Sequence, residues 1–412
     1  MSDVAYSPSG KRLLTTSADG TVRLWSLRSR KGPWTAPALT ASASGRFLAW
    51  KSNDQVVVYD LESARVNRVS PLPRTPLHSL TLNAEGTNML VVVHDPTTAR
   101  SNRLSSSLWD SRVDQVIGNM FPLDGDPTRQ SLSPDGMKIS LAIRDRLEVN
   151  ITSSGKRLAS FVVPDTNLTS LAWSRSSDRL AAASGRTLLL IDPQHSTLLW
   201  TQEVHHSMAL SKVTFSKDGR RIATATGDKT ISPGEARIWD TESGKEIGIP
   251  IRHKDGVSDV AFSVDGRWIA TGSEDFTAQV WDSKTGIPMS RSLRHQDEVS
   301  SVAFSTDGHW LVTACRDGSA RVWDLETSEP LTPPLRHAGR LAAARLVGSD
   351  TRLLTETRDG KMWLWILPFD QRPSSEIRQW ARILSADRSE TQPADHAGQR
   401  PSLESEFQHL SR

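Results

Sequence analysis

The fold of this chain is decided by a stretch that begins Val257-Ser-Asp-Val-Ala-Phe-Ser-Val-Asp-Gly266 and ends Thr277-Ala-Gln-Val-Trp-Asp282. The same pattern returns as Val299-Ser-Ser-Val-Ala-Phe-Ser-Thr-Asp-Gly308, followed by Ala320-Arg-Val-Trp-Asp324. Outward from these copies, tryptophans recur at a spacing of 42 residues, at Trp239, Trp281, Trp323 and Trp365. A fixed period of this size indicates a repeat protein, in which each copy is one small unit stacked on the next.

Each copy contains three short runs of β-branched and alternating apolar residues, separated by turn residues. Asp-Gly pairs at 218–219, 265–266 and 307–308 fit tight hairpin turns, because glycine adopts positive φ without a steric penalty. A fourth run, such as Lys245–His253, links one copy to the next. The pattern predicts four antiparallel strands per copy, which make one blade.

These residues resemble the WD40 family, over roughly residues 3–366 and most closely in the last four copies. The resemblance implies an all-β fold, a β-propeller, with a hydrogen-bonded quartet in each blade. The quartet consists of a histidine before the first strand, a threonine or serine in the second, an aspartate in the following turn, and the tryptophan. The matching positions are His206, Thr224, Asp228 and Trp239; His253, Thr271, Asp275 and Trp281; His295, Thr313, Asp317 and Trp323; and His337, Thr355, Asp359 and Trp365.

We expect these quartets to be structural. Indole, hydroxyl, imidazole and carboxylate groups satisfy one another's hydrogen bonds, so all four can be buried together. Each bond contributes only about 1 kcal/mol net, whereas an unsatisfied buried partner costs about 1–3 kcal/mol. The sequence therefore predicts no catalytic residue, no cofactor-binding residue and no metal ligand among them.

Nine repeat units can be counted, above the four to eight blades usual for one propeller. In the first predicted arrangement, units three to nine form a seven-bladed ring closed by the segment near Arg65–Pro71. Residues 1–63 are then two extra units of an incomplete array, and residues 64–367 are the propeller. In the alternative, an eight-bladed ring is closed by the segment near Lys31–Leu39; a nine-bladed ring is the third arrangement. Because the repeat starts inside a blade, we expect the chain to be the downstream part of a longer protein.

The period stops after Pro368, and residues 368–412 are predicted to be a C-terminal tail. Within it, Ile377, Trp380, Ala381 and Leu384 lie on one face of an expected short amphipathic helix. The tail is similar to those that follow WD40 arrays in large bacterial regulatory proteins, some of which carry an upstream Ser/Thr kinase domain.

Composition excludes several classes of protein. The 412 residues carry 50 Lys+Arg against 47 Asp+Glu, a balance that predicts neither a nucleic-acid partner nor a membrane partner. A single cysteine, Cys315, excludes a disulfide framework and a cysteine zinc site. No apolar run reaches the roughly 18 residues of a membrane-spanning helix, and no signal region opens the sequence. We expect a cytoplasmic bacterial protein; its oligomeric state stays open.

The sequence contains no phosphate-binding glycine loop, no kinase His-Arg-Asp or Asp-Phe-Gly element, no Gly-x-Ser-x-Gly and no His-Glu-x-x-His. The pair His205-His206 lacks a third ligand at metal spacing, and Cys315 on an expected strand is a packed thiol. The sequence favours a non-catalytic scaffold that binds other proteins and uses no cofactor. Two alternatives stay open: a regulatory or substrate-recruiting part of a Ser/Thr protein kinase, and a propeller enzyme or small-ligand binder.

The candidate partner-binding residues are Trp268 and Trp310. They stand three positions before the quartet threonine in two adjacent units, where three other units have Arg12, Arg221 and Arg352. Tryptophan is enriched at binding hot spots, so two exposed indoles on neighbouring blades predict a protein-docking patch. In the alternative interpretation, each indole lies flat on its own blade.

Overall fold

The computed structural model of this protein describes most of the repeat region and little of the tail. The described residues are 3–6, 12–16, 22–26, 30–34, 40–42, 46–52, 55–60, 65–69, 77–83, 85–94, 104–110, 115–123, 127–164, 168–203, 209–226, 233–347 and 350–367. The chain divides into two compact units: Met1–Arg28 with Leu367–Arg412, and Ser29–Ile366. The predicted helix near residues 376–384, and nearly all of the tail, lie outside the described residues. No helix in the described ranges is long and apolar enough to cross a membrane.

The smaller unit contains one three-stranded antiparallel sheet. Its strands are β1 (Asp3–Tyr6), β2 (Arg12–Thr16) and β3 (Val22–Ser26), paired in that order. This sheet is the first of the nine repeat units counted in the sequence.

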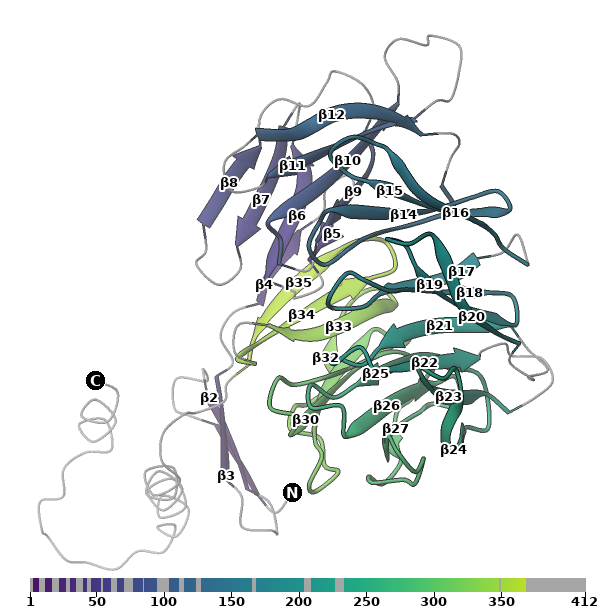
Figure 1. The fold of residues 1–412 in the computed structure, drawn as a ribbon. Coiled ribbons are helices and arrows are strands. Elements are labelled where there is room, and N and C mark those ends of the chain that lie inside the picture. Colours follow the sequence, from purple (N-terminus) through teal and green to yellow (C-terminus); the bar gives the residue numbers. More distant parts are fainter. Residues whose placement is uncertain are drawn as a thin grey trace, which may run out of the picture. The chain divides into compact units, whose positions relative to one another are not determined.

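The larger unit is an eight-bladed β-propeller, and each blade is a four-stranded antiparallel sheet (Figure 1). Blades 1 to 4 are formed by β5 (Thr40–Ala41), β6 (Phe47–Ser52), β7 (Gln55–Asp60) and β8 (Arg65–Val69); β9 (Leu77–Leu82), β10 (Asn88–His94), β11 (Leu104–Asp110) and β12 (Gln115–Leu123); β13 (Arg129–Leu132), β14 (Lys138–Ile143), β15 (Arg146–Ile151) and β16 (Arg157–Val162); and β17 (Leu168–Trp173), β18 (Leu180–Ser184), β19 (Thr187–Asp192) and β20 (Thr197–Glu203).

Blades 5 to 8 repeat the plan with closer sequence similarity to one another. They are formed by β21 (Leu210–Phe215), β22 (Arg221–Thr226), β23 (Glu235–Asp240) and β24 (Glu246–Arg252); β25 (Val257–Phe262), β26 (Trp268–Ser273), β27 (Thr277–Asp282) and β28 (Leu293–Arg294); β29 (Val299–Phe304), β30 (Trp310–Cys315), β31 (Ser319–Asp324) and β32 (Leu335–Arg336); and β33 (Leu341–Val347), β34 (Arg352–Thr357), β35 (Met362–Ile366) and β4 (Arg30–Trp34).

Blade 8 combines three strands from the end of the repeat region with β4 from its beginning. Met362 is paired with Trp34, and Trp365 with Arg30, in an antiparallel register. The structure therefore has the eight-bladed closure, and the seven-bladed closure by Arg65–Pro71 is wrong. The reason is local: β8 directly follows β7 and pairs with it in blade 1, and closing a short loop costs less entropy than closing a long one. The ring unit thus begins at Ser29 rather than at residue 64.

Neighbouring blades are held together by apolar side chains that alternate along the middle strands. In β10, Met89, Val91 and Val93 pack into the cluster shared with blade 1, whereas Leu90 and Val92 pack into the cluster shared with blade 3. Successive strand residues point to opposite faces of a sheet, so each blade is apolar on both faces. Burying one such side chain contributes about 1.5–3 kcal/mol, which makes stacking of blades the main stabilising interaction.

From blade 1 to blade 8, the first strand of each blade lies against the first strand of the next. The Thr169 hydroxyl on β17 lies 2.6 Å from the Leu210 carbonyl of blade 5, and that of Ser211 lies 3.0 Å from the Val257 carbonyl of blade 6. Ser300 repeats the bridge from blade 7 to blade 8. These hydroxyl groups fix the relative position of adjacent first strands along the strand direction. The turns at the ends of these strands are therefore held in defined places.

Candidate functional site

The quartet of blade 6 is complete, with His253, Thr271 and Trp281 buried and its aspartate half-buried. The Trp281 indole N–H donates to Thr271 Oγ1 over 2.8 Å, and His253 Nε2 lies 2.7 Å from the same oxygen. His253 Nδ1 lies 3.1 Å from Asp275 Oδ2. Because a carboxylate only accepts hydrogen bonds, Nδ1 is the donor and Nε2 accepts from the threonine hydroxyl. The structure thus brings the four predicted residues into one chain of hydrogen bonds.

Asp275 remains charged at the outer end of this chain. Burial raises its pKa, but hydrogen bonds from His253 and Thr277, together with the Lys254 backbone N–H, outweigh burial and hold the pKa of Asp275 well below its usual range. The carboxylate is therefore engaged by the fold, and the imidazole next to it is fixed in orientation. In this arrangement both groups are bonded within the fold.

Blade 7 carries the same four residue types but a different arrangement. The Trp323 indole donates to Thr313 Oγ1 over 2.9 Å, as in blade 6. His295, however, has no hydrogen-bond partner at either ring nitrogen, and Asp317 accepts from Ser319 instead. Burial lowers the pKa of His295 to about 4, and the charge of Arg321 adds to this effect. In blade 7 the predicted hydrogen bonds from the histidine to the threonine and to the aspartate are therefore missing.

In blade 8 the quartet loses its aspartate. His337 Nε2 lies 2.8 Å from Thr355 Oγ1, and the Trp365 indole donates to the same oxygen over 3.1 Å. His337 Nδ1 lies 2.9 Å from the Gly318 carbonyl of blade 7, in place of Asp359. Asp359 is exposed and pairs with Lys361 over 2.6 Å. A backbone carbonyl thus supplies the acceptor that the sequence assigned to the carboxylate.

In blade 5 half of the quartet can be placed. The Trp239 indole donates to Thr224 Oγ1 over 2.9 Å, and both residues are buried. His206 and Asp228 lie outside the described residues. In blade 2, which the sequence did not assign a quartet, the Trp109 indole donates to Ser107 on its own strand.

Groups with catalytic potential are few in the described ranges. Cys315 is fully buried, and burial raises the pKa of its thiol to about 12, so it stays protonated at neutral pH. No cluster of three or more His, Cys, Asp or Glu residues with the geometry of a metal site occurs among the residues that the structure describes. His205 and His206 are outside those ranges.

Trp268 and Trp310 begin the second strands of blades 6 and 7, and both are half-buried. The Trp268 ring packs on the apolar cluster between these two blades, and the Arg267 guanidinium lies 5.2 Å from the ring centroid. In blade 5 the same position is Arg221, whose guanidinium stacks over Phe262 of blade 6. This position therefore reaches toward the next blade, and both indoles keep part of their surface exposed.

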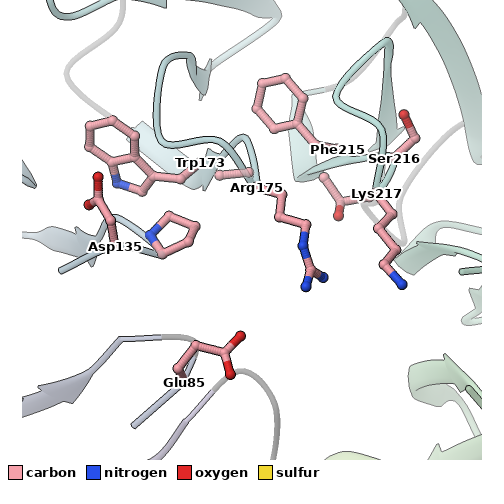
Figure 2. Close-up of a pocket in the computed structure, with 10 residues that line it drawn as sticks. Glu85, Asp135, Trp173, Arg175, Phe215, Ser216 and Lys217 are labelled. Atoms are coloured by element: carbon pink, nitrogen blue, oxygen red, sulfur yellow. The ribbon is translucent and has the colours of Figure 1, made fainter. Parts of the chain in front are cut away.

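The candidate site that the structure adds is a pocket of about 420 Å³. It is formed at what we call the first-turn end of the ring, where the first strand of each blade turns into the second. Four consecutive blades contribute to it: blade 2 with Glu85, blade 3 with Pro134 and Asp135, blade 4 with Ala172, Trp173 and Arg175, and blade 5 with Thr214, Phe215, Ser216 and Lys217. In Figure 2 the side chains of Arg175 and Lys217 extend into the open space, and the Glu85 carboxylate faces that space from another wall.

A second pocket, of about 480 Å³, lies between blades 6 and 7 at the opposite ends of these strands. His253, Asp275 and His295 of the quartets line it, together with the exposed cations Lys254 and Arg294. It is therefore the outer surface of the structural quartets.

Sequence reasoning missed the first-turn pocket because its residues come from turns between strands. In those turns the serine and the aspartate recur from copy to copy, whereas the residue that follows the serine varies. A weak signal was present. The residue after the turn serine is Arg175 in blade 4 and Lys217 in blade 5, but Val264 and Thr306 in blades 6 and 7. Two adjacent cations at one repeat position mark a local departure from the repeat.

Fold and site together define a repeat-built β-propeller. The family described as "WD domain, G-beta repeat" matches residues 1–26, 196–232, 244–282 and 288–324. Among solved structures, the crystal structure of the computationally designed Ika8 protein is similar, with a TM-score of 0.63 and 19% sequence identity over 81% of this chain and 97% of that chain. At this identity the likeness concerns the fold alone. WD40 repeats in a β-propeller arrangement are therefore present in this chain.

Proposed function

We propose that this protein is a non-catalytic scaffold that binds other proteins. Propellers of this kind typically serve as interaction scaffolds, because a rigid ring presents many loops at fixed positions. The observation that carries the proposal is the use of the polar side chains. In blades 6 and 8 the histidines are committed to bonds within the fold, whereas the first-turn end exposes unmatched charges and half-buried tryptophans.

The first-turn end is the proposed docking surface. The pocket of blades 2 to 5 opens there, and Trp268 and Trp310 stand at the same end on blades 6 and 7. Aromatic side chains that are already fixed by packing lose little entropy when a partner covers them. This surface therefore combines rigid tryptophan and phenylalanine side chains with Arg175, residue types that are enriched at protein interfaces.

Capture of partners by the full chain tests the proposal. The tagged protein is cross-linked in a lysate of its source organism. Captured proteins whose amount reaches a plateau as more lysate is added are identified by mass spectrometry. The variant Trp268→Arg/Trp310→Arg introduces the residue that blade 5 has at this position, so its circular dichroism and urea midpoint should stay near those of the wild type. Phe276→Gly is the control: Phe276 is exposed on blade 6, beyond the second strand, and glycine suits its φ of 68°.

We expect the wild type and the Phe276→Gly variant to capture the same partner, and the double arginine variant to lose it. If the double variant keeps the partner, the tryptophan patch is wrong while the scaffold role stands. If no protein is captured by the wild type to a plateau, the scaffold role is wrong.

A further inference from the structure

We propose that the first-turn pocket binds a partner peptide through one acidic side chain placed next to one apolar side chain. This inference rests on the proposed scaffold function and names the chemistry of the partner. The carboxylate of the peptide is bound by Arg175 and Lys217, and the apolar side chain packs on Trp173 and Phe215.

The two cations follow the serine of similar turns in adjacent blades, although the aspartate that receives the serine hydroxyl stands four residues later in blade 4 and two residues later in blade 5. In blade 4 the Ser174 hydroxyl donates to Asp178 over 2.6 Å, and in blade 5 the Ser216 hydroxyl donates to Asp218 over 2.6 Å. The serine also accepts the backbone N–H that closes each turn. The residue after the serine therefore stands on a rigid turn, with its side chain directed away from it.

Both cations are available to a partner. Arg175 and Lys217 are exposed, and no hydrogen bond or ion pair from either side chain is found in the described part of the chain. The turn aspartates are occupied by serine hydroxyl groups and backbone N–H groups. In blade 7, by contrast, the hydroxyl of Thr306 at this position is bound to Asp350. Blades 4 and 5 thus present two uncommitted positive charges in one pocket.

The apolar wall is rigid as well. Trp173 packs on the cluster between blades 3 and 4, and its indole N–H donates to the Ser131 carbonyl over 3.2 Å. Phe215 packs on the cluster between blades 4 and 5. Because both rings are fixed before binding, their outer faces offer apolar area at low entropic cost.

The other wall limits how much negative charge the pocket accepts. Glu85 and Asp135 are exposed and line the same cavity, and Asp135 receives bonds only from Ser133 and its own turn. Two carboxylates repel a run of acidic residues or a phosphate backbone, since like charges in one site are destabilising. The charge distribution therefore favours a single carboxylate with an apolar neighbour over a polyanion.

Peptide binding to the full chain tests this inference directly. Four fluorescein-labelled peptides share a Gly-Ser frame and carry Glu-Leu, Gln-Leu, Glu-Ser or four consecutive glutamates at the centre. Fluorescence anisotropy then gives Kd for each. We expect the Glu-Leu peptide to bind roughly tenfold or more tightly than each of the other three. The Gln-Leu peptide lacks the carboxylate, the Glu-Ser peptide lacks the apolar side chain, and the tetraglutamate peptide is repelled by the acidic wall.

Matched variants locate the binding. Arg175→Ser/Lys217→Ser should weaken the Glu-Leu peptide by roughly tenfold or more, whereas Lys254→Ser/Arg294→Ser, which removes the same charges from the other pocket, should change Kd less than about twofold. Glu85→Gln should improve binding of the tetraglutamate peptide. Equal affinity of the Gln-Leu and Glu-Leu peptides, or equal loss in the two double variants, would overturn the inference.

These results are independent of partner capture from a lysate. If the chain captures a partner but no peptide prefers the pocket, the inference about the pocket is wrong and the scaffold role stands. If the Glu-Leu peptide binds at Arg175 and Lys217 but no protein is captured, the pocket chemistry is right and the scaffold role is wrong.

Discussion

Blades 6 and 7 are the closest relatives within the ring, yet their quartets differ. In blade 6, His253 is bonded to both Thr271 and Asp275. In blade 7, His295 is enclosed without a bond at either ring nitrogen, although Thr313 still receives the indole N–H of its blade. Identical residue types in identical order therefore do not guarantee identical bonding.

The difference lies in the residues around the quartet. Blade 6 has Gln279 where blade 7 has Arg321, and the charge of Arg321 lies close enough to lower the pKa of His295 further. Blade 6 has Ser273 where blade 7 has Cys315, whose thiol is engaged with the Asp297 carbonyl. Burial and this nearby cation both disfavour a protonated imidazole, so His295 is neutral at pH 7, and Asp317 accepts hydrogen bonds from Ser319 instead.

The largest expected effect is a pH dependence that His295 gives to blade 7. Above pH 6.5, His295 is neutral in both folded and unfolded chains and contributes nothing. Between pH 6.5 and about 4 the unfolded chain binds a proton there and the folded chain does not, so stability falls by about 3 kcal/mol across that window. Urea unfolding at both ends of the window should show this extra loss in the wild type and not in His295→Leu. Parallel pH curves for the two proteins would contradict the assignment.

Replacing each histidine by leucine compares the blades directly. His253→Leu leaves the half-buried Asp275 carboxylate without its imidazole partner and breaks the bond to Thr271, so it should lower the free energy of unfolding by about 2–3 kcal/mol at pH 7.5. His295→Leu breaks no ring-nitrogen bond and removes two unsatisfied atoms, so the change should stay within about 1 kcal/mol. Equal losses in the two variants would show that the blades are bonded alike.

A double-mutant cycle isolates the histidine–aspartate interaction in each blade. For His253→Leu with Asp275→Asn we expect a coupling energy of about 1–2 kcal/mol, because the two groups are directly bonded. The cycle with His295→Leu and Asp317→Asn should give a coupling near zero, about 0.3 kcal/mol or less. Urea unfolding of the seven proteins, the wild type being shared by the two cycles, provides both values, and strong coupling in blade 7 would refute the broken quartet.

The smallest effect is expected from a substitution that makes the surroundings of the His295 imidazole resemble those of His253. Arg321→Gln removes the cation that lowers the pKa of His295, so that pKa should rise toward its ordinary value. Burial remains the larger cause, and we expect only part of the shift to be recovered. Titration of the imidazole protons by NMR measures the change, with stability within about 0.5 kcal/mol of the wild type. A fall in the pKa would show that Arg321 acts in another way.

The fold was predictable because its signal is local and repeated. Alternation in the strands and Asp-Gly turns define each blade within a few dozen residues, as in Val257–Asp282. The closure was left between alternatives because the pairing of β4 with β35 joins segments at opposite ends of the repeat region. No local pattern in Arg30–Trp34 indicates which distant strand this segment pairs with.

The site was less predictable. Residue type placed His253, Thr271 and Trp281 together, but it could not show that Asp359 faces Lys361 while His337 meets a backbone carbonyl. Those outcomes depend on side-chain rotamers and neighbouring charges. The first-turn pocket was missed for a similar reason, since its four separate turns come together only when blades 2 to 5 are stacked.

The origin of β4 has a consequence for how the protein is made. This strand leaves the ribosome before blades 1 to 7, and its partner β35 leaves after them. Until translation reaches β35, the backbone groups of β4 that pair with it have no strand to meet, and an open arc of blades exposes an apolar face. A chain truncated before β35 would therefore be an aggregation-prone arc rather than a smaller ring, because blade 8 is completed only when β35 has been made.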